Sequence, residues 1–166
     1  VQALIICPTR ELSEQVAKEI RKLARLIFNV KVLNLSGGTP MFPQISSLEH
    51  GAHCIVGTPG RIQDHLNRRT LSLNRVNTLV LDEADRMLDM GFSEVLNYIV
   101  NYVPSNRQTL LFSATMPKEI AMISSNYMNN AIEISVSKKN TTSSNVNHVF
   151  YKVCVLQSEE TQRESR

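Results

Sequence analysis

The chain has 166 residues, of which 42% are hydrophobic and 20% are charged, proportions that indicate a globular protein with one hydrophobic core. No apolar run approaches the roughly 20 residues that span a bilayer, so the composition excludes a transmembrane protein and predicts no membrane partner. The net charge of +3 at pH 7 does not by itself require a nucleic-acid partner. Residues 1–75 hold ten Lys and Arg against five Asp and Glu, which is compatible with contact to a polyanion, although solvated helix faces would explain the same excess.

Cysteine and histidine usage excludes two further classes. The three cysteines, Cys7, Cys54 and Cys154, are widely spaced and odd in number, which argues against a disulfide framework and against a zinc cluster. All three lie in apolar stretches, so we predict buried, reduced thiols and a cytoplasmic protein. The four histidines show no metal-ligand spacing.

Apolar runs alternate with helical patterns along the chain. The start, VQALIIC, has neither Met nor a basic segment, which predicts a chain cut just before a strand rather than a signal peptide. Short runs rich in Val, Ile and Leu predict six strands: Ala3–Cys7, Lys31–Leu35, His53–Gly57, Thr78–Asp82, Gln108–Ser113 and Ala131–Val136. Helices are predicted between them at Glu11–Ile27, Gln44–Glu49, Pro59–Arg68, Ser93–Tyr102 and Pro117–Tyr127.

The first helix is the clearest element, since its apolar residues repeat at spacings of three and four: Leu12, Val16, Ile20, Leu23 and Ile27. Nearly continuous apolar strands are typical of a parallel sheet that is covered on both faces. Repeated strand–helix–strand units therefore predict an α/β fold, a doubly wound and mostly parallel sheet with helices on both faces. Such sheets bind ligands beyond the carboxyl ends of their strands.

The chain divides into three segments by composition. Residues 1–136 carry the strand and helix patterns, whereas residues 137–147 (SKKNTTSSNVN) are polar, lack periodicity and predict a linker. Residues 148–166 begin with an apolar run and a helix start. They are too short for a second core, so we interpret them as the severed start of another domain.

One strand end carries two adjacent carboxylates. The run LVLDEAD places Asp82 and Glu83 directly after an apolar strand, at the ligand edge of the sheet. One carboxylate there can serve Mg²⁺, and its neighbour can orient or deprotonate an attacking water. Acids in the first turn of an ordinary helix would give the same four letters, so this run alone decides nothing.

The other strand ends add phosphate-binding features. Thr9 and Thr58 are placed to cap the helices that follow their strands, and helix N-termini bind anions. Arg10 and Arg61 lie beside them, and Pro59 suits the first helical position. The remaining turns are PTREL after the first strand, Ser36-Gly37-Gly38 after the second, TPGR after the third and Ser113-Ala114-Thr115 after the fifth.

In order and approximate spacing, PTREL, GG, TPGR, DEAD and SAT resemble the motifs of the DEAD-box ATP-dependent RNA helicase family. The resemblance covers about residues 1–135, and the wording LDEADRMLDMGF and RQTLLFSATMP is similar to the bacterial DbpA-like subgroup. It implies the first RecA-like domain of a P-loop NTPase type of fold, truncated at its N-terminus. The family's activity is RNA-stimulated ATP hydrolysis coupled to local unwinding of short RNA duplexes, with a role in ribosome biogenesis.

The resemblance also implies roles and partners. RNA would be contacted through its sugar-phosphate backbone by Pro8, Thr9, Arg10, Gly37, Gly38, Thr58, Pro59, Gly60 and Arg61. Asp82 would hold Mg²⁺ through water, with Glu83 beside it as the residue that positions the hydrolytic water. Asp85 would hydrogen-bond with Ser113 and Thr115 and couple the ATP site to the RNA path. A second RecA-like domain of the same polypeptide would complete both sites.

The sequence contains no G-x-x-x-x-G-K-[ST], the loop that grips ATP phosphates in this family. We expect that loop upstream of Val1, so the chain alone would be inactive as an ATPase. Without the P-loop strand we also expect exposed apolar surface and unpaired sheet edges. Three alternatives stay open: a non-enzymatic RNA-backbone-binding fragment, a DNA translocase of a related superfamily 2 type, and a purely structural α/β module.

Overall fold

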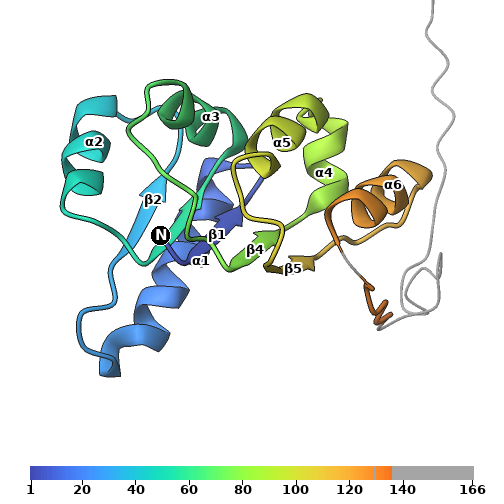
Figure 1. Cartoon of the computed structure of the whole chain (residues 1–166), viewed down its shortest axis with the longest axis horizontal. Helices are drawn as coiled ribbons and strands as arrows, with labels where there is room; N and C mark the ends of the chain where they lie inside the picture. The colour runs from blue at the N-terminus through green and yellow to red at the C-terminus, as the bar shows by residue number, and fades with distance from the viewer. Residues whose placement is uncertain (129, 136–166) are drawn as a thin grey trace, which may run out of the picture. The chain divides into compact units, whose positions relative to one another are not determined.

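Five parallel strands form one sheet in the order β2-β3-β1-β4-β5 (Figure 1). The structure, a computed structural model, describes residues 1–128 and 130–135, and Val1–Glu133 form one compact unit. The strands are β1 (Ala3–Ile6), β2 (Val32–Leu35), β3 (Cys54–Gly57), β4 (Thr78–Leu81) and β5 (Gln108–Leu111). The predicted parallel α/β sheet is therefore confirmed, and each observed strand lies within one of the first five predicted ranges.

The strand ends are aligned across the sheet. Ile6 lies opposite Gly57 on one side and Leu81 on the other. The same rung continues to Leu35 in β2 and to Leu111 in β5. The turns that follow the five strands therefore leave the sheet from one level.

Helices connect the strands and cover both faces of the sheet. They are α1 (Arg10–Leu23) with a 3-10 turn at Ala24–Leu26, α2 (Met41–Glu49), α3 (Pro59–Asn67), α4 (Ala84–Asp89), α5 (Ser93–Val100) and α6 (Lys118–Tyr127). Figure 1 shows α1 on the side of the sheet opposite to α3 and α5. Of the helices in the described residues, none is long and apolar enough to cross a bilayer.

The core has two clusters because alternate strand residues face opposite sides. Leu4 and Ile6 of β1 join the larger cluster with side chains of α3, α5 and α6. Ile5 and Cys7 belong to the smaller cluster, which packs against Ala17 of α1. Burial, followed by the charges of Asp82 and Glu83, raises the pKa of the buried Cys7 thiol to about 12, so it stays protonated. Cys154 lies outside the described residues.

Three helices of the structure differ from the sequence prediction. The first helix ends at Leu23 rather than Ile27, and the side chains of these two residues are 80% and 63% exposed. The chain becomes extended at Ile27 and turns at Asn29, where φ is 64°, to enter β2. α2 begins at Met41, three residues before the predicted start, and α4 was not predicted as a helix.

The predicted strand at Ala131–Val136 is wrong over residues 131–135, which adopt no strand conformation. An apolar pattern favours a strand where its side chains pack against a half-buried sheet surface, and the side chains of Ile132 and Ile134 do not. Ile132 and Ile134 accordingly expose 85% and 84% of their surface. The predicted linker (137–147) and second-domain start (148–166) lie outside the described residues.

Candidate functional site

The turns after β1, β2 and β3 line one groove of about 410 Å³. Its lining comprises Pro8, Thr9, Arg10, Gly37, Thr58, Gly60, Arg61, Asp64, Met90 and Phe92. All the residues predicted for RNA contact line it except Gly38 and Pro59. The convergence follows from the sheet order, because β2, β3 and β1 are adjacent and end at one level.

Arg10 and Gly38 are in close contact across this groove. Gly38 has φ of +75°, a left-handed conformation that glycine adopts readily. A Cβ at this position would lie 1.9 Å from Nη1 of Arg10, so a larger residue would displace the guanidinium from this position. The Arg10 side chain is 55% exposed, and its Nη2 lies 3.7 Å from Oε1 of Glu11. Its charge is therefore available to a ligand in the groove.

The two predicted helix caps behave differently. Thr9 caps α1 as predicted, since its Oγ1 accepts a hydrogen bond of 3.3 Å from the amide of Leu12. Thr58 occupies the cap position of α3, but its side chain makes no capping hydrogen bond. Its Oγ1 instead accepts a hydrogen bond from the amide of Gly37 at 3.4 Å. The hydroxyl thus connects the turn after β3 to the turn after β2.

Arg61 is less accessible than its sequence position predicts. Its side chain is 11% exposed, and both terminal nitrogens donate to the carbonyl of Thr39 at 2.9 and 3.0 Å. Nε lies 3.9 Å from a carboxylate oxygen of Asp64 and makes no hydrogen bond. Arg61 therefore braces the turn after β2, which leaves Arg10 as the more exposed guanidinium.

Sequence reasoning did not select Thr39, Asp64, Met90 or Phe92. Thr39 carries the carbonyl that receives Arg61. Asp64 lies three residues after Arg61 on α3, a helical spacing that could have predicted their ion pair. Met90 and Phe92 follow α4 and reach the groove through tertiary packing, which has no local signal in the sequence.

The paired carboxylates lie at the end of β4. The backbone amide of Asp82 donates to the carbonyl of Ile6 in β1 at 3.0 Å, and its Oδ1 accepts from the amide of Glu83 at the same distance. Burial, and to a lesser degree the charge of Glu83, raises the pKa of Asp82, although the Glu83 amide opposes this shift. The negative charge of two carboxylates in a partly desolvated position favours binding of a cation, which can then bridge the carboxylates and a ligand.

Glu83 has a strained backbone. Its φ of 49° and ψ of 53° lie in the left-handed region, which costs a non-glycine residue about 1–2 kcal/mol. A hydrogen bond from the next residue holds this conformation. The backbone amide of Ala84 donates to the carbonyl of Phe112, after β5, at 3.0 Å. The Glu83 side chain is 43% exposed and lies 3.4 Å from Nη1 of Arg86. A strained residue beside the ligand edge is typical of a functional position.

Asp85 joins the turns after β4 and β5. One carboxylate oxygen accepts hydrogen bonds from the amide and the hydroxyl of Thr115, at 2.9 and 2.8 Å. The Asp85 amide donates to Oγ of Ser113 at 3.3 Å. Burial acts to raise the pKa of Asp85, but the bonds from Thr115 and from the amide of Arg86 together hold it below its usual value. The expected contacts among Asp85, Ser113 and Thr115 are thus present.

The donor set suits Mg²⁺. Within the part of the chain that the structure describes, no group of three or more His, Cys, Asp or Glu could enclose a metal ion. Mg²⁺ commonly needs no such cage, since it binds one or two carboxylates together with water and substrate phosphates. Asp82 and Glu83 could supply such oxygens at the end of β4.

Comparisons with known proteins agree with this geometry. The family model described as DEAD/DEAH box helicase matches residues 1–123. The chain is 54% identical over 135 residues to the ATP-dependent RNA helicase DbpA of Escherichia coli (strain K12), covering 81% of this chain and 30% of the relative. It is 48% identical over 153 residues to the DEAD-box ATP-dependent RNA helicase CshA of Geobacillus kaustophilus (strain HTA426), covering 92% and 32%.

The fold comparison gives the same result. The crystal structure of a DEAD box protein from the hyperthermophile Methanococcus jannaschii matches with a TM-score of 0.74 at 47% identity, over 78% of this chain and 35% of that one. The chain spans about a third of the length of these relatives. The resemblance to this family and to its DbpA-like members is confirmed: the chain belongs to the DEAD/DEAH box helicase family.

Proposed function

We propose that this chain is part of an ATP-dependent RNA helicase that unwinds short RNA duplexes. In this proposal the chain holds one RNA strand by its sugar-phosphate backbone and contributes carboxylates to hydrolysis of Mg²⁺-bound ATP. The observation that carries the proposal is the convergence of three braced turns on one groove beside the exposed guanidinium of Arg10.

The groove suits a backbone rather than bases. The N-termini of α1 and α3 lie at its wall, where helix dipoles favour phosphate. The Gly37-Gly38 turn carries no side chains, so a sugar and its 2′-hydroxyl can approach the peptide closely. Contacts of this kind fix the position of a strand without reading its sequence.

The carboxylates divide into two proposed roles. Asp82 would help to hold Mg²⁺ through water, and Glu83 would orient the attacking water and accept its proton. Asp85 transmits the state of this site through Thr115 to the turn after β5, because its carboxylate accepts both the amide and the hydroxyl of that residue. A bound ATP would supply the phosphates that complete the Mg²⁺ coordination.

The wider setting belongs to the same proposal. A second RecA-like domain of the same polypeptide would close over the RNA and the ATP. A cytoplasmic location and a role in ribosome biogenesis accompany this assignment; the buried Cys7 and Cys54 thiols are compatible with a reducing compartment.

RNA binding tests the first half of the proposal. Fluorescence anisotropy of labelled single-stranded RNA and of DNA of the same sequence, at two salt concentrations, should give tighter and salt-sensitive binding to RNA. Arg10→Gln should weaken binding and reduce the salt slope by about 0.7, the contribution of one phosphate contact to a single strand. Equal affinity for DNA would instead favour the DNA translocase. Salt-insensitive binding would contradict the proposal that the groove binds the RNA backbone.

ATP hydrolysis tests the second half. The sequence holds no G-x-x-x-x-G-K-[ST], which favours a second candidate, an RNA-binding piece without enzymatic activity of its own. Coupled ATPase assays should therefore detect turnover only after fusion to a segment that carries such a loop. In the fusion, Glu83→Gln should lower kcat by about 100-fold or more, since a general base contributes that much. Turnover that survives Glu83→Gln would contradict the proposed role.

A further inference from the structure

The turn between β2 and α2, residues Ser36–Thr39, needs support from outside itself. Gly38 is left-handed, and the hydroxyl of Thr39 returns to the carbonyl of Ser36 at 3.1 Å. From the groove side, Oγ1 of Thr58 accepts a hydrogen bond from the amide of Gly37, and the Arg61 guanidinium donates to the carbonyl of Thr39. From the protein side, the turn is held by a chain of buried polar side chains.

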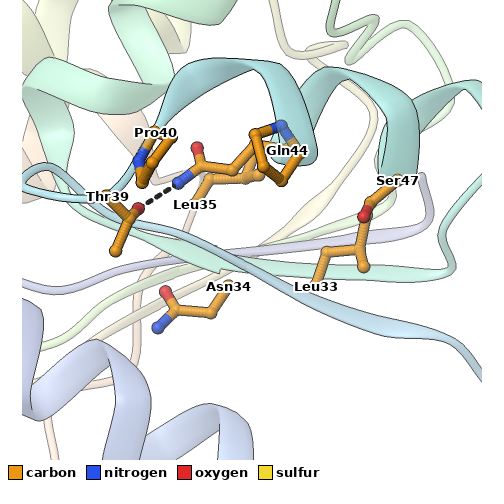
Figure 2. A pocket seen from close by; sticks show the side chains of 8 residues that line it. Leu33, Asn34, Leu35, Thr39, Pro40, Gln44 and Ser47 are labelled. Atoms are coloured by element: carbon orange, nitrogen blue, oxygen red, sulfur yellow. Dashed lines mark hydrogen bonds between the residues drawn. The ribbon is translucent and has the colours of Figure 1, made fainter.

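Gln44 of α2 is the first member of that chain and is 9% exposed. Its amide nitrogen donates to the carbonyl of Ser36 at 3.1 Å and to the hydroxyl of Thr39 at 2.6 Å. Figure 2 shows the Gln44 side chain directed toward Thr39, with Leu35 of β2 beside it. The pocket in that view has a volume of about 230 Å³, and the Gln44 and Thr39 side chains in its wall bind each other.

His65 of α3 is the second member and is fully buried. Its Nε2 lies 2.9 Å from Oε1 of Gln44, and its Nδ1 lies 2.8 Å from the hydroxyl of Thr70. Because the Gln44 amide nitrogen already donates to Ser36, its oxygen must accept, so Nε2 of His65 carries the proton. Nδ1 is then free to accept from the Thr70 hydroxyl, which lies closer to Nδ1 than to its second acceptor, the carbonyl of His65 at 3.2 Å.

His65 is neutral at physiological pH. Burial is the largest cause that lowers its pKa, and the charges of Arg61 and Arg68 act in the same direction, against an opposing effect of Asp64. A neutral imidazole is one donor and one acceptor, which matches Gln44 on one side and Thr70 on the other. The tautomer is thereby fixed by its two partners.

These contacts are costly to maintain unless all are made, because a buried donor or acceptor without a partner is strongly unfavourable. They run from Thr70, three residues after the end of α3, to the glycine turn beside the groove. We propose that Gln44 and His65 are positioning residues that hold the Ser36–Thr39 turn in the conformation that receives the RNA backbone. This inference rests on the proposed function of the groove.

Three substitutions test the chain of contacts in the 166-residue protein. Gln44→Leu removes both donors to the turn and should weaken RNA binding by about 5–10-fold at unchanged salt slope, since no phosphate contact is lost. Thr70→Val removes the partner of Nδ1 and should weaken binding by about 2–3-fold. Thr70→Ser keeps the hydroxyl and should restore the wild-type affinity.

Stability is separated from positioning by a control and by a spectrum. Val103→Ala removes buried apolar atoms away from the groove, so it should lower the melting temperature and leave RNA affinity unchanged. In ¹⁵N–¹H correlation spectra, Gln44→Leu and Thr70→Val should shift the amide signals of Gly37 and Gly38. The signals of Gly51 and Gly91, which lie outside the turn, should stay in place.

The outcomes are distinguishable. If the wild-type protein does not bind RNA, the proposed function fails, while the glycine spectra still report whether the turn moves. If the wild type binds and Thr70→Val keeps full affinity with unmoved Gly37 and Gly38 signals, the positioning role is overturned. Should Gln44→Leu fail to fold, the Thr70 pair decides the question alone.

Discussion

The two halves of the ligand edge are built differently. Beside β1, β2 and β3, the turns are connected to one another through Thr58, Arg61 and Gln44, and α1 packs beneath those strands. Beside β4 and β5, the turns are connected through Asp85 with its partners and the backbone bond from Ala84, and within the described residues β5 pairs only with β4. Leu110 and Phe112 there remain 37% and 55% exposed.

The difference indicates what each half requires. The proposed RNA half has rigid turns because a strand held by its backbone needs fixed donors. The carboxylate half retains a raised pKa at Asp82 and a strained backbone at Glu83, both unfavourable until a cation and phosphates are bound. The proposed RNA half is thus organised before a ligand binds, whereas the carboxylate half depends on the cation and phosphates that bind to it. Four predictions test this contrast.

The largest effect is expected at Gly57, the last residue of β3. A Cβ there would lie 2.3 Å from the backbone oxygen of Leu35, an atom that cannot move without shifting β2. Gly57→Ala should therefore lower the free energy of unfolding by about 3 kcal/mol, the upper end for overpacking. Urea denaturation measures it. Gly60→Ala is the control, because nothing lies within 4 Å of its Cβ position, and a loss there as large would contradict the packing argument.

A second effect should separate backbone strain from displacement of Arg10. Gly38→Ala and Gly51→Ala introduce an alanine at nearly the same φ, +75° and +77°, so each should cost about 1 kcal/mol of stability. Only the first clashes with Arg10, whereas Gly51 has open space. RNA affinity should fall about tenfold in Gly38→Ala alone. If RNA affinity falls equally in both variants, Arg10 is not part of the proposed site.

The two aspartates of the DEAD run should respond oppositely to pH. The raised pKa of Asp82 means that its stabilising contribution is present below its unfolded pKa and is lost as pH rises through the folded value. The lowered pKa of Asp85 gives a contribution that is present above its unfolded pKa and is lost as pH falls through the folded value. At pH 7, Asp82→Asn should thus raise the melting temperature and Asp85→Asn should lower it, each by about 2 °C.

Melting curves at pH 7 and pH 3 check both signs. The gain from Asp82→Asn should shrink at pH 3, because the wild-type carboxyl is then largely protonated in both states. The loss from Asp85→Asn should shrink as well, once its carboxylate is titrated. A gain that grows on acidification would reverse the assigned shift of Asp82.

The smallest effect on stability concerns the open edge. Leu110 lies opposite Val80 on the same face of the sheet as α1, yet it remains 37% exposed, and within the described residues β5 pairs only with β4, so this apolar surface should promote self-association. Leu110→Lys should increase the monomer fraction in sedimentation velocity and change stability by no more than about 0.5 kcal/mol. Gln108→Lys adds the same charge to the same strand. If Gln108→Lys increases the monomer fraction as much as Leu110→Lys does, the backbone of β5 rather than the apolar side chain drives association.

Much of this arrangement could be predicted because the strands are short, apolar and separated by helices. Their five ends place Thr9, Thr58 and Asp82 at one edge without knowledge of the order of the strands. The order itself depends on tertiary packing, and so does the strand predicted at Ala131–Val136, which is wrong over residues 131–135, where Ile132 and Ile134 are not buried. Its length of six residues carried no independent signal of pairing.

For the groove, sequence reasoning selected residues but did not predict the contacts that brace its turns. Caps and glycines have local signatures, so Thr9 and Gly38 could be read from short stretches. Thr58 also satisfies the signature of a cap, yet its hydroxyl serves Gly37, 21 residues away. The contact between Gln44 and His65 spans the same separation and has no local pattern. The left-handed Glu83 likewise depends on its neighbour strand rather than on its own sequence.

The common level at which all five strands end has a consequence for how such a chain can change in length. A residue inserted into any strand would raise the following turn by about 3.3 Å and rotate its side chains to the other face. The loops at the opposite edge, such as the one between Ile27 and Lys31, bear no such constraint. Insertions and deletions should therefore occur in the loops at the amino ends of the strands, while the number of residues at the carboxyl ends stays constant.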